Sequence, residues 1–428
     1  MDLKTPQPDP RESEPSDTIR GVRRVWGWVR DAIEAAYGRL FHNLTDFFAD
    51  RQLLVWLLAL MIGAGVAYAA LIFRTLIGVT QLLWLGTTSE SVYGTARELP
   101  WIVVLLAPAV GGVIVGLLLE RVVPGRRAHG VADVIEARAI GDCKIPLVQG
   151  LWGGVLSVLS LGFGASAGRE GPMVHLGATI ASRLEDFFKL SQGARRTLLA
   201  CGVAAAVSAS FNAPLAGVIF AHEVILAHYA LRAFVPIVIS SVAAAVITRI
   251  HFGNYPAFLV PEYQIHSYLE FPAFALLGVT CALVAILFEL SLMMTERVAW
   301  QIKMPLWMRP AVGGLLVGAI AVFFPQVLGV GYDSTDTALK QGFPLSVLLL
   351  LIVAKTAATS ITLASRFAGG VFSPALYLGA MTGCAYGLIA ASVFPEIASS
   401  NGLYALLGAG AVAAAVLGAP ISSTLIVF

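Results

Sequence analysis

The sequence predicts an all-α membrane protein of two inverted-topology helical repeats, with broken and re-entrant helices among full spans. Hydrophobic residues make up 57% of the 428 residues and charged residues only 13%, against roughly 25% charged residues in a soluble domain. Several apolar runs approach or exceed the length of about 20 residues that crosses a bilayer. Two similar glycine-containing breaks interrupt apolar segments at corresponding places in the two halves of the chain. Together these features exclude an ordinary soluble protein.

Apolar runs locate the expected membrane spans. The runs that predict spans are 53–85, 101–119, 233–247, 274–294 and 345–363. Shorter or interrupted runs, at 131–140 and 312–324, predict re-entrant or tilted pieces. Irregular backbone at membrane depth is tolerated only where protein or a water-filled vestibule surrounds it. The 42 glycines and 21 prolines fit such interrupted helices.

The N-terminal region differs from the rest of the chain. Residues 1–19 are rich in Pro, Asp, Glu and Ser, a composition that predicts a disordered tail. Residues 20–49 begin with a basic stretch that carries tryptophans, so we expect an amphipathic interfacial helix on the cytoplasmic side. Residues 50–428 are expected to form the transmembrane domain. The net charge of +2 says nothing about partners. The four scattered cysteines show no disulfide or metal spacing, and we expect no cofactor, no metal and no nucleic-acid partner.

The two breaks share one motif. Residues 168–178 and 370–380 both read G-x-x-x-P-x-x-x-L-G-A. A helix N-terminus has unpaired N–H groups and a positive partial charge, so two N-termini aimed at one point make an anion site without a full positive charge. Broken helices at matching places in two halves of a membrane protein point to a transport site near the bilayer midplane.

A second match extends the internal repeat. The segment VAAAV occurs at 203–207 and at 412–416, and Ala-Pro follows each of them, at 213–214 and 419–420. We therefore expect structural repeats over about 45–230 and 270–428 within one domain. In this register the chain stops at the position that corresponds to His222. The second repeat is therefore expected to be truncated at its C-terminus, and the native chain to continue further.

Three motifs in order identify a family resemblance. The segments GREGP at 168–172, FNAPLAGVIFAHE at 211–223 and GGVFSP at 369–374 closely resemble the CLC family of chloride channels and chloride/proton antiporters, from about residue 50 onward. The resemblance implies a CLC-type fold and a homodimer in which each subunit has its own anion pathway. It also implies transport of chloride, with bromide and nitrate as further candidate anions, and of protons in the antiporters. We expect a multi-pass protein of a bacterial inner membrane.

The resemblance assigns roles to single residues. Glu170 is implied as the gate, a carboxylate that competes with the anion and swings aside when it is protonated; the alternative is a glutamate that only caps its helix. The amides of Val371 and Phe372 would face the central anion, while Arg169 would contribute mainly to the field of the vestibule. The implied anion-binding residues are His129, Gly130, Gly168, Arg169, Gly171, Val371, Phe372 and Ser373.

The first anion motif departs from the family pattern. The family typically has G-S-G-I-P where this chain has AHGVA at 128–132, so His129 replaces a serine. A neutral imidazole can still donate one N–H to an anion. Its charge can change between about pH 5 and 8, which predicts a pH-dependent site. The alternative is that His129 faces the vestibule and binds no ion.

A second departure concerns coupling to protons. Family antiporters commonly carry two consecutive glutamates in the helix of the FNAPLAG motif; Glu223 matches the first, and Val224 occupies the place of the second. Because valine carries no proton, we favour channel-like conductance of the voltage-gated type. Glu170, Glu223 and His222 are the candidate proton carriers that leave antiport open. The tyrosine that the family's last helix supplies to the central anion has no counterpart up to Phe428.

Other functional classes fit less well. A zinc protease of the HExxH type would need a second histidine at position 226, which is Leu226, so we expect no enzymatic activity and no catalytic residues. An ion-coupled carrier of organic solutes would also use broken helices. Such a carrier needs polar side chains that recognise the solute, whereas this site offers mainly main-chain amides and one carboxylate. A fluoride-selective relative is disfavoured because that branch usually departs from the motif at Pro172.

Overall fold

A computed structural model of the chain describes residues 51–89, 91–188, 190–254, 265, 267–340, 342–396 and 399–428, together with Trp28 and Glu34. Residues Trp56–Phe428 form one compact unit, and the fold below concerns this unit. The predicted tail over 1–19 and the predicted interfacial helix over 20–49 lie outside the described residues, apart from Trp28 and Glu34.

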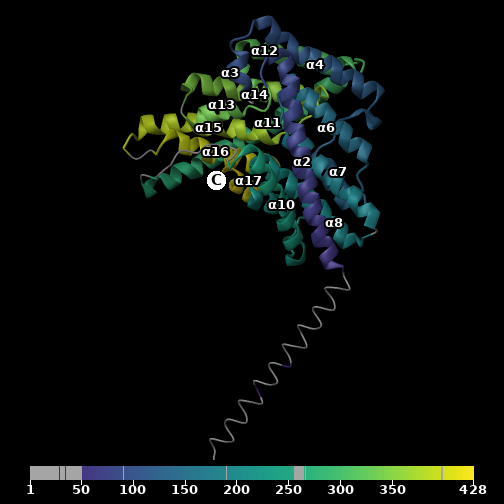
Figure 1. The fold of residues 1–428 in the computed structure, drawn as a ribbon. Helices are drawn as coiled ribbons and strands as arrows, with labels where there is room; N and C mark the ends of the chain where they lie inside the picture. The colour runs from purple at the N-terminus through teal and green to yellow at the C-terminus, as the bar shows by residue number, and fades with distance from the viewer. Residues whose placement is uncertain are drawn as a thin grey trace, which may run out of the picture. The chain divides into compact units, whose positions relative to one another are not determined.

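The described part of the chain is helical, with a single isolated β-bridge (Figure 1). The first half contains α2 (Gln52–Leu85), α3 (Val92–Ala96), α4 (Trp101–Arg121), η1 (Pro124–Arg126), α5 (Val131–Ala139), α6 (Leu147–Gly162), α7 (Glu170–Phe188), α8 (Gln192–Phe211), α9 (Pro214–Phe220), the π-helical turn η2 (Ala221–Leu226) and α10 (Leu231–Phe252). The second half contains η3 (Tyr268–Glu270), α11 (Phe271–Gln301), α12 (Met308–Phe323), η4 (Pro325–Val327), α13 (Tyr332–Leu339), α14 (Leu345–Ala364), α15 (Phe372–Val393), α16 (Asn401–Leu417) and α17 (Pro420–Val427).

Six of the described helices are long and apolar enough to cross a membrane. They are α2, α4, α10, α14, α15 and the continuous helical stretch Tyr268–Gln301 that includes α11. All five predicted runs lie within this set, and α15 is a further candidate span that was not among the predicted runs. The short run at 131–140 forms α5, and the run at 312–324 lies largely within α12, a helix of 16 residues.

The two halves repeat the same order of helices. The helices of the series α4 to α9 match those of the series α12 to α17 in order, and the matching helices have similar lengths. The long helices α8 and α16 both end on a left-handed residue, Asn212 with φ of 56° and Gly418 with φ of 62°. Each is then followed by a short helix that begins with proline, α9 or α17. The order of elements supports the predicted repeat, whose exact boundaries stay a prediction.

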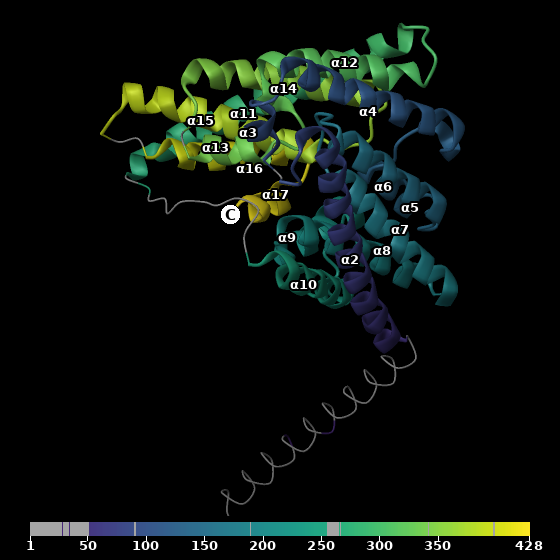
Figure 2. The same ribbon diagram turned by 45° about the horizontal axis from the view of Figure 1, so that its top comes forward.

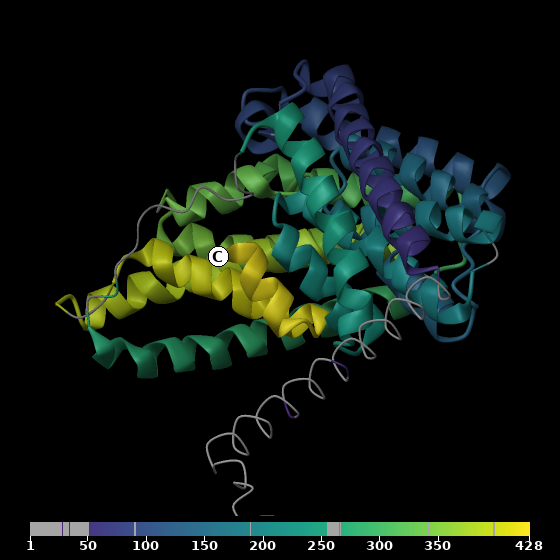
Figure 3. The same ribbon diagram turned by 60° about the horizontal axis from the view of Figure 1, so that its bottom comes forward.

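Helices α7 and α15, which begin at the two glycine motifs, are each held by close packing against a neighbouring helix. Helices α7 and α8 pack together, as do α15 and α16, and α17 packs against α9 and α16 (Figures 2 and 3). A Cβ on Gly408 would lie 2.4 Å from the carbonyl oxygen of Gly379, and a Cβ on Gly379 only 2.2 Å from that of Gly408. The pair α7/α8 makes the same reciprocal contact between Gly177 and Gly202. Small residues let membrane helices approach closely enough for main-chain contact.

Exposed apolar side chains cover the outer faces of the spanning helices. In α11, for example, Leu276, Val279, Leu283 and Leu287 are each more than half exposed. In water such a surface would be unstable, whereas lipid tails solvate it at no cost. The outer helices therefore fit a bilayer environment.

The α15/α16 contact generates a stability prediction. Gly408→Ala places a methyl group 2.4 Å from a main-chain oxygen, so the helices must separate, and we expect a loss of about 1–3 kcal/mol of stability. Thermal unfolding of the purified protein in detergent measures the loss. Gly278→Ala in α11 is the matched control, because a Cβ there meets no atom within 4 Å. Equal stability of the two variants would contradict this account of the packing.

Candidate functional site

Gly168 and Gly370, 202 positions apart in the sequence, join the two helix breaks through one antiparallel bridge. The N–H of Gly168 donates to the carbonyl oxygen of Gly370 at 2.7 Å, and the N–H of Gly370 donates to that of Gly168 at 2.8 Å. A Cβ on Gly370 would lie 3.1 Å from the nitrogen of Gly171, so a side chain here would push the two segments apart. The bridge therefore brings the N-termini of α7 and α15 together.

Glu170 occupies the point where these two helices begin. It is the first residue of α7 and is only 2% exposed. Its Oε1 accepts a hydrogen bond from the Tyr332 hydroxyl at 2.6 Å, and its Oε2 accepts one from the Ser373 hydroxyl at 2.5 Å. Since Ser373 lies in the first turn of α15, the carboxylate of α7 rests on the N-terminal turn of the other helix. The positive end of a helix stabilises negative charge there.

The other predicted residues of this motif lie around the same point. The Nε of Arg169 is 3.8 Å from Oε1 of Glu170. Val371 is the residue that precedes α15, and Phe372 is its first residue. The buried Phe372 ring packs against Phe211, with ring centroids 4.9 Å apart. Gly168, Arg169, Glu170, Gly171, Val371, Phe372 and Ser373 are thus all brought to one site.

His129 and Gly130 stand at the N-terminus of a third helix, α5. The Asp133 carboxylate accepts the Gly130 N–H at 2.8 Å and contacts Nδ1 of His129 at 3.1 Å. Arg127 pairs with the same carboxylate at 2.5 Å. Although burial raises the pKa of Asp133, the His129 and Gly130 hydrogen bonds and the charges of His129 and Arg127 together hold it well below its usual value. Asp133 is therefore ionised at neutral pH.

An ionised Asp133 fixes the tautomer of His129. The carboxylate can only accept hydrogen bonds, so the proton of the neutral ring lies on Nδ1. The other nitrogen, Nε2, is buried and has no hydrogen-bond partner in the structure. A neutral His129 therefore has no N–H left for an anion, contrary to the expectation from the sequence. Only the protonated ring could donate from Nε2.

His129 contacts α7 at a position C-terminal to Glu170. Its ring stacks on that of His175, with centroids 5.2 Å apart and an interplanar angle of 15°. His175 follows Glu170 by five residues, which is roughly 7.5 Å along an α-helix. The structure therefore places His129 against the same helix as the carboxylate, more than one turn C-terminal to Glu170, rather than in contact with it.

The candidate proton carriers on η2 are engaged elsewhere. Glu223 accepts hydrogen bonds from the main-chain N–H groups of Ile421 at 3.1 Å and Ser422 at 2.9 Å, and from the Ser422 hydroxyl at 2.8 Å. It thereby caps α17 of the other half. Nδ1 of His222 contacts the carbonyl oxygen of His228 at 2.8 Å. The sequence brought these two residues forward as proton carriers, and the structure shows them in capping and loop contacts.

Two residues of the site escaped the sequence analysis. Tyr332, the first residue of α13, supplies a hydroxyl to Glu170. Lys355 lies in the span α14 and is fully buried, and its Nζ donates to the carbonyl oxygens of Val327 at 3.0 Å and Gly329 at 3.1 Å. Those carbonyls belong to the segment that leads into Tyr332, so Lys355 positions the hydroxyl that holds Glu170. A lone charge in an apolar span is itself a signal of function. Lys355 is such a charge within the run 345–363, so the sequence did contain a signal for it.

Lys355 generates a prediction for this segment. Lys355→Met leaves two buried carbonyl oxygens without a donor, at a cost of about 1–3 kcal/mol for each. We expect a lower thermal stability and partial rescue by Lys355→Arg, which restores donors and charge. Lys340→Met is the control, because Lys340 forms an exposed pair with Asp336, and such pairs contribute about 1 kcal/mol or less. Unfolding in detergent distinguishes the variants; a Lys355→Met protein as stable as the control would refute the positioning role.

Comparisons with known proteins identify the fold and the family. The family model described as Voltage gated chloride channel matches residues 111–428. A protein of Ralstonia nicotianae named putative chloride channel protein ClcB-like is 34% identical over 373 residues, which cover 86% of each chain. The H(+)/Cl(-) exchange transporter ClcA of Vibrio cholerae is 31% identical over 390 residues, covering 88% of this chain and 80% of that one.

A solved structure confirms the expected fold class. The structure of a slow cyanobacterial Cl-/H+ antiporter superimposes with a TM-score of 0.74 at 24% identity, covering 87% of this chain and 88% of that one. The expectations of an all-helical, multi-span membrane protein and of a non-enzymatic family are therefore confirmed. From the family model and the relatives, we conclude that this chain belongs to the family of voltage-gated chloride channels, the CLC family.

Proposed function

We propose that the protein carries chloride, and with it small monovalent anions such as bromide and nitrate, along a pathway gated by Glu170. One observation carries the proposal: a buried carboxylate rests where two helix N-termini meet, held by the hydroxyls of Tyr332 and Ser373. Donors arranged for a carboxylate oxygen also suit a halide. The anion and Glu170 would therefore compete for one place.

The chemistry of this place suits rapid passage. A lysine or arginine at the centre of a membrane helix costs roughly 2.5–3.5 kcal/mol on insertion scales, and in place of the helix ends it would hold a halide in the Glu170 seat more tightly than they do. Conduction needs binding that is moderate and spread over several sites. Helix ends and hydroxyl groups offer only fractional charges, and the guanidinium of Arg169 stands 3.8 Å to one side. An organic solute would require recognition groups that this small buried place does not provide.

Uncoupled, channel-like conductance is our preferred form of this transport. Val224 stands where the family resemblance places a second, proton-carrying glutamate. The neighbouring Glu223 caps α17 through two main-chain N–H groups and a hydroxyl, so its protonation would weaken a helix cap. His222 is fully buried, with Nδ1 in contact with a carbonyl oxygen. These contacts favour structural roles for both residues.

Chloride/proton exchange is the second candidate. The stacked pair of His129 and His175 supports it, because His175 follows Glu170 along α7 and His129 stacks on it. The similarity to an exchange transporter of Vibrio cholerae, alongside that to a channel-like protein, is consistent with either mode. Assembly as a homodimer and residence in a bacterial inner membrane stay predictions of the family resemblance.

Glu170→Ala tests the gate. Without the carboxylate, no side chain competes with the anion for this place. We therefore expect chloride efflux from liposomes at least as fast as in the unmodified protein, and no longer accelerated by acid. Glu136→Ala removes an exposed glutamate of α5 and should retain the acid response. If Glu170→Ala kept both the rate and the acid response of the unmodified protein, Glu170 would not be the gate.

The same liposomes distinguish the two modes of transport. Under a chloride gradient and with no proton gradient, the channel-like mode predicts chloride flow without proton movement. Clear uphill proton flux in the unmodified protein would instead assign exchange. Loss of that flux in His129→Ser, with retention in His251→Ser, would then place the proton route at the stacked histidines.

His129 generates a pH prediction with a defined sign. Because Asp133 engages Nδ1, Nε2 gains a proton to donate only in the protonated ring. Anion affinity should therefore rise as the pH falls and the ring of His129 gains its second proton. In His129→Ser a hydroxyl donates at every pH, so this rise should be smaller than in the unmodified protein. Chloride titration calorimetry at several pH values measures it, with the exposed His251→Ser as control. An unchanged pH profile in His129→Ser would overturn the assignment.

A further inference from the structure

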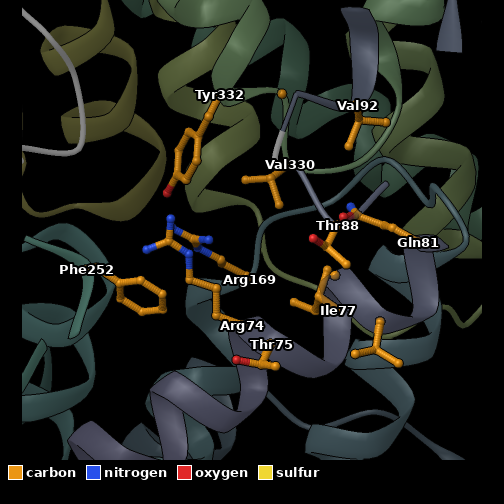
Figure 4. Close-up of a pocket in the computed structure, with 13 residues that line it drawn as sticks. Arg74, Thr75, Ile77, Gln81, Thr88, Val92, Arg169, Phe252, Val330 and Tyr332 are labelled. Atoms are coloured by element: carbon orange, nitrogen blue, oxygen red, sulfur yellow. The ribbon is translucent and has the colours of Figure 1, made fainter. Parts of the chain in front are cut away.

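A cavity of about 460 Å³ lies beside Glu170 and is lined by Arg74 of α2, Arg169, Phe252 of α10 and Tyr332 (Figure 4). Thr75 and Thr88 add hydroxyl groups to its wall. None of the sequence motifs pointed to Arg74. It is nevertheless a charged residue in the middle of a long apolar helix, where a charge usually marks a functional site.

Aromatic rings orient the two arginines. The guanidinium carbon of Arg74 lies 4.0 Å from the centroid of the Phe252 ring, and that of Arg169 lies 4.9 Å from the centroid of the Tyr332 ring. Figure 4 shows both guanidinium groups turned toward the same part of the cavity, below the Tyr332 hydroxyl. Both arginines also line a smaller adjoining cavity. Two like charges that share a cavity repel each other, and an anion between them relieves the repulsion.

The cavity shares its donors with Glu170. The Nε of Arg169 is 3.8 Å from Oε1 of Glu170, and the Tyr332 hydroxyl donates to the same oxygen at 2.6 Å. An anion bound by Arg74 and Arg169 would draw Arg169 away from the carboxylate. Occupancy of the cavity would thus loosen the hold on Glu170.

We propose that this cavity is a second anion-binding site in series with the Glu170 seat, in which Arg74 and Arg169 hold a small monovalent anion. The edge of a guanidinium presents parallel N–H donors that match two oxygens of a planar oxyanion. The site therefore binds nitrate more tightly than chloride, whereas the seat at the helix ends has no such fork. The identity of the anions in this proposal rests on the proposed transport function. Their location rests on the cavity.

Titration calorimetry of the full chain in detergent, with potassium nitrate and potassium chloride, tests the proposal. We expect two classes of sites in the unmodified protein. Arg74→Gln should weaken one class about tenfold or more for nitrate, as expected from the loss of hydrogen bonds to a charged group, and leave the other class in place. Arg74→Lys keeps the charge but removes one of the two guanidinium groups, so it should retain chloride binding and reduce the preference for nitrate.

Arg97→Gln is the matched control, because Arg97 is an exposed arginine that lines a different cavity. Loss of the same class of sites in Arg97→Gln would assign the effect to general charge and overturn the proposal. A single class of sites in the unmodified protein, or the same isotherm in Arg74→Gln, would also overturn it while leaving transport at Glu170 intact. No anion binding in the unmodified protein would contradict the proposed function itself.

Anomalous scattering from bromide provides a measurement that needs no variant. Crystals of the unmodified chain grown in bromide should show a peak between the two guanidinium groups, separate from any peak at the helix ends. A peak at the helix ends alone would overturn the second site.

Discussion

The main-chain bridge between Gly168 and Gly370 is the constraint on which the rest of the site depends. Its two hydrogen bonds join segments from opposite halves of the chain, and each of these segments leads directly into a helix. Side chains at these glycines would separate the segments. Their absence lets α7 and α15 begin at nearly the same point, where two sets of unpaired N–H groups and two positive helix ends combine. The proposed anion seat is thus a consequence of backbone geometry.

The same geometry supports our proposal that one carboxylate, that of Glu170, acts as the gate. Burial of a charge is expensive unless hydrogen bonds and local fields compensate for it, and Glu170 receives both from α15, Ser373 and Tyr332. An anion in the same place would receive the same compensation. Protonation removes the charge that the helix ends stabilise, so the neutral side chain is held less strongly at this place. Arg74 and Arg169 on the adjoining cavity then provide a neighbouring place for an anion.

The sequence predicted what repeats or periodicity could show, and it missed what depends on long-range contacts. The two glycine motifs predicted that two helix N-termini aim at one point, and in the structure Glu170 and Ser373 come from these two N-termini. Tyr332 could not be found in this way, since its partner is 162 positions away and no motif joins them. The tautomer of His129 depends on Asp133, one helical turn along, whose role as a partner only the structure reveals. Lys355 was accessible from sequence, because its charge stands alone in an apolar span.

Two glutamates of this fold sit on helix N-termini of the other half, and their donors explain why only one of them suits a gate. Glu223 accepts two fixed main-chain N–H groups of α17, so leaving would orphan both donors. Glu170 accepts two side-chain hydroxyls, which can rotate to bind water, an anion or each other; those of Tyr332 and Ser373 are already 3.4 Å apart. The departure of Glu170 therefore leaves its partners satisfied. Glu223, held by main-chain groups, therefore suits a structural role as a helix cap. Glu170, held by rotatable hydroxyls, can be exchanged for a halide.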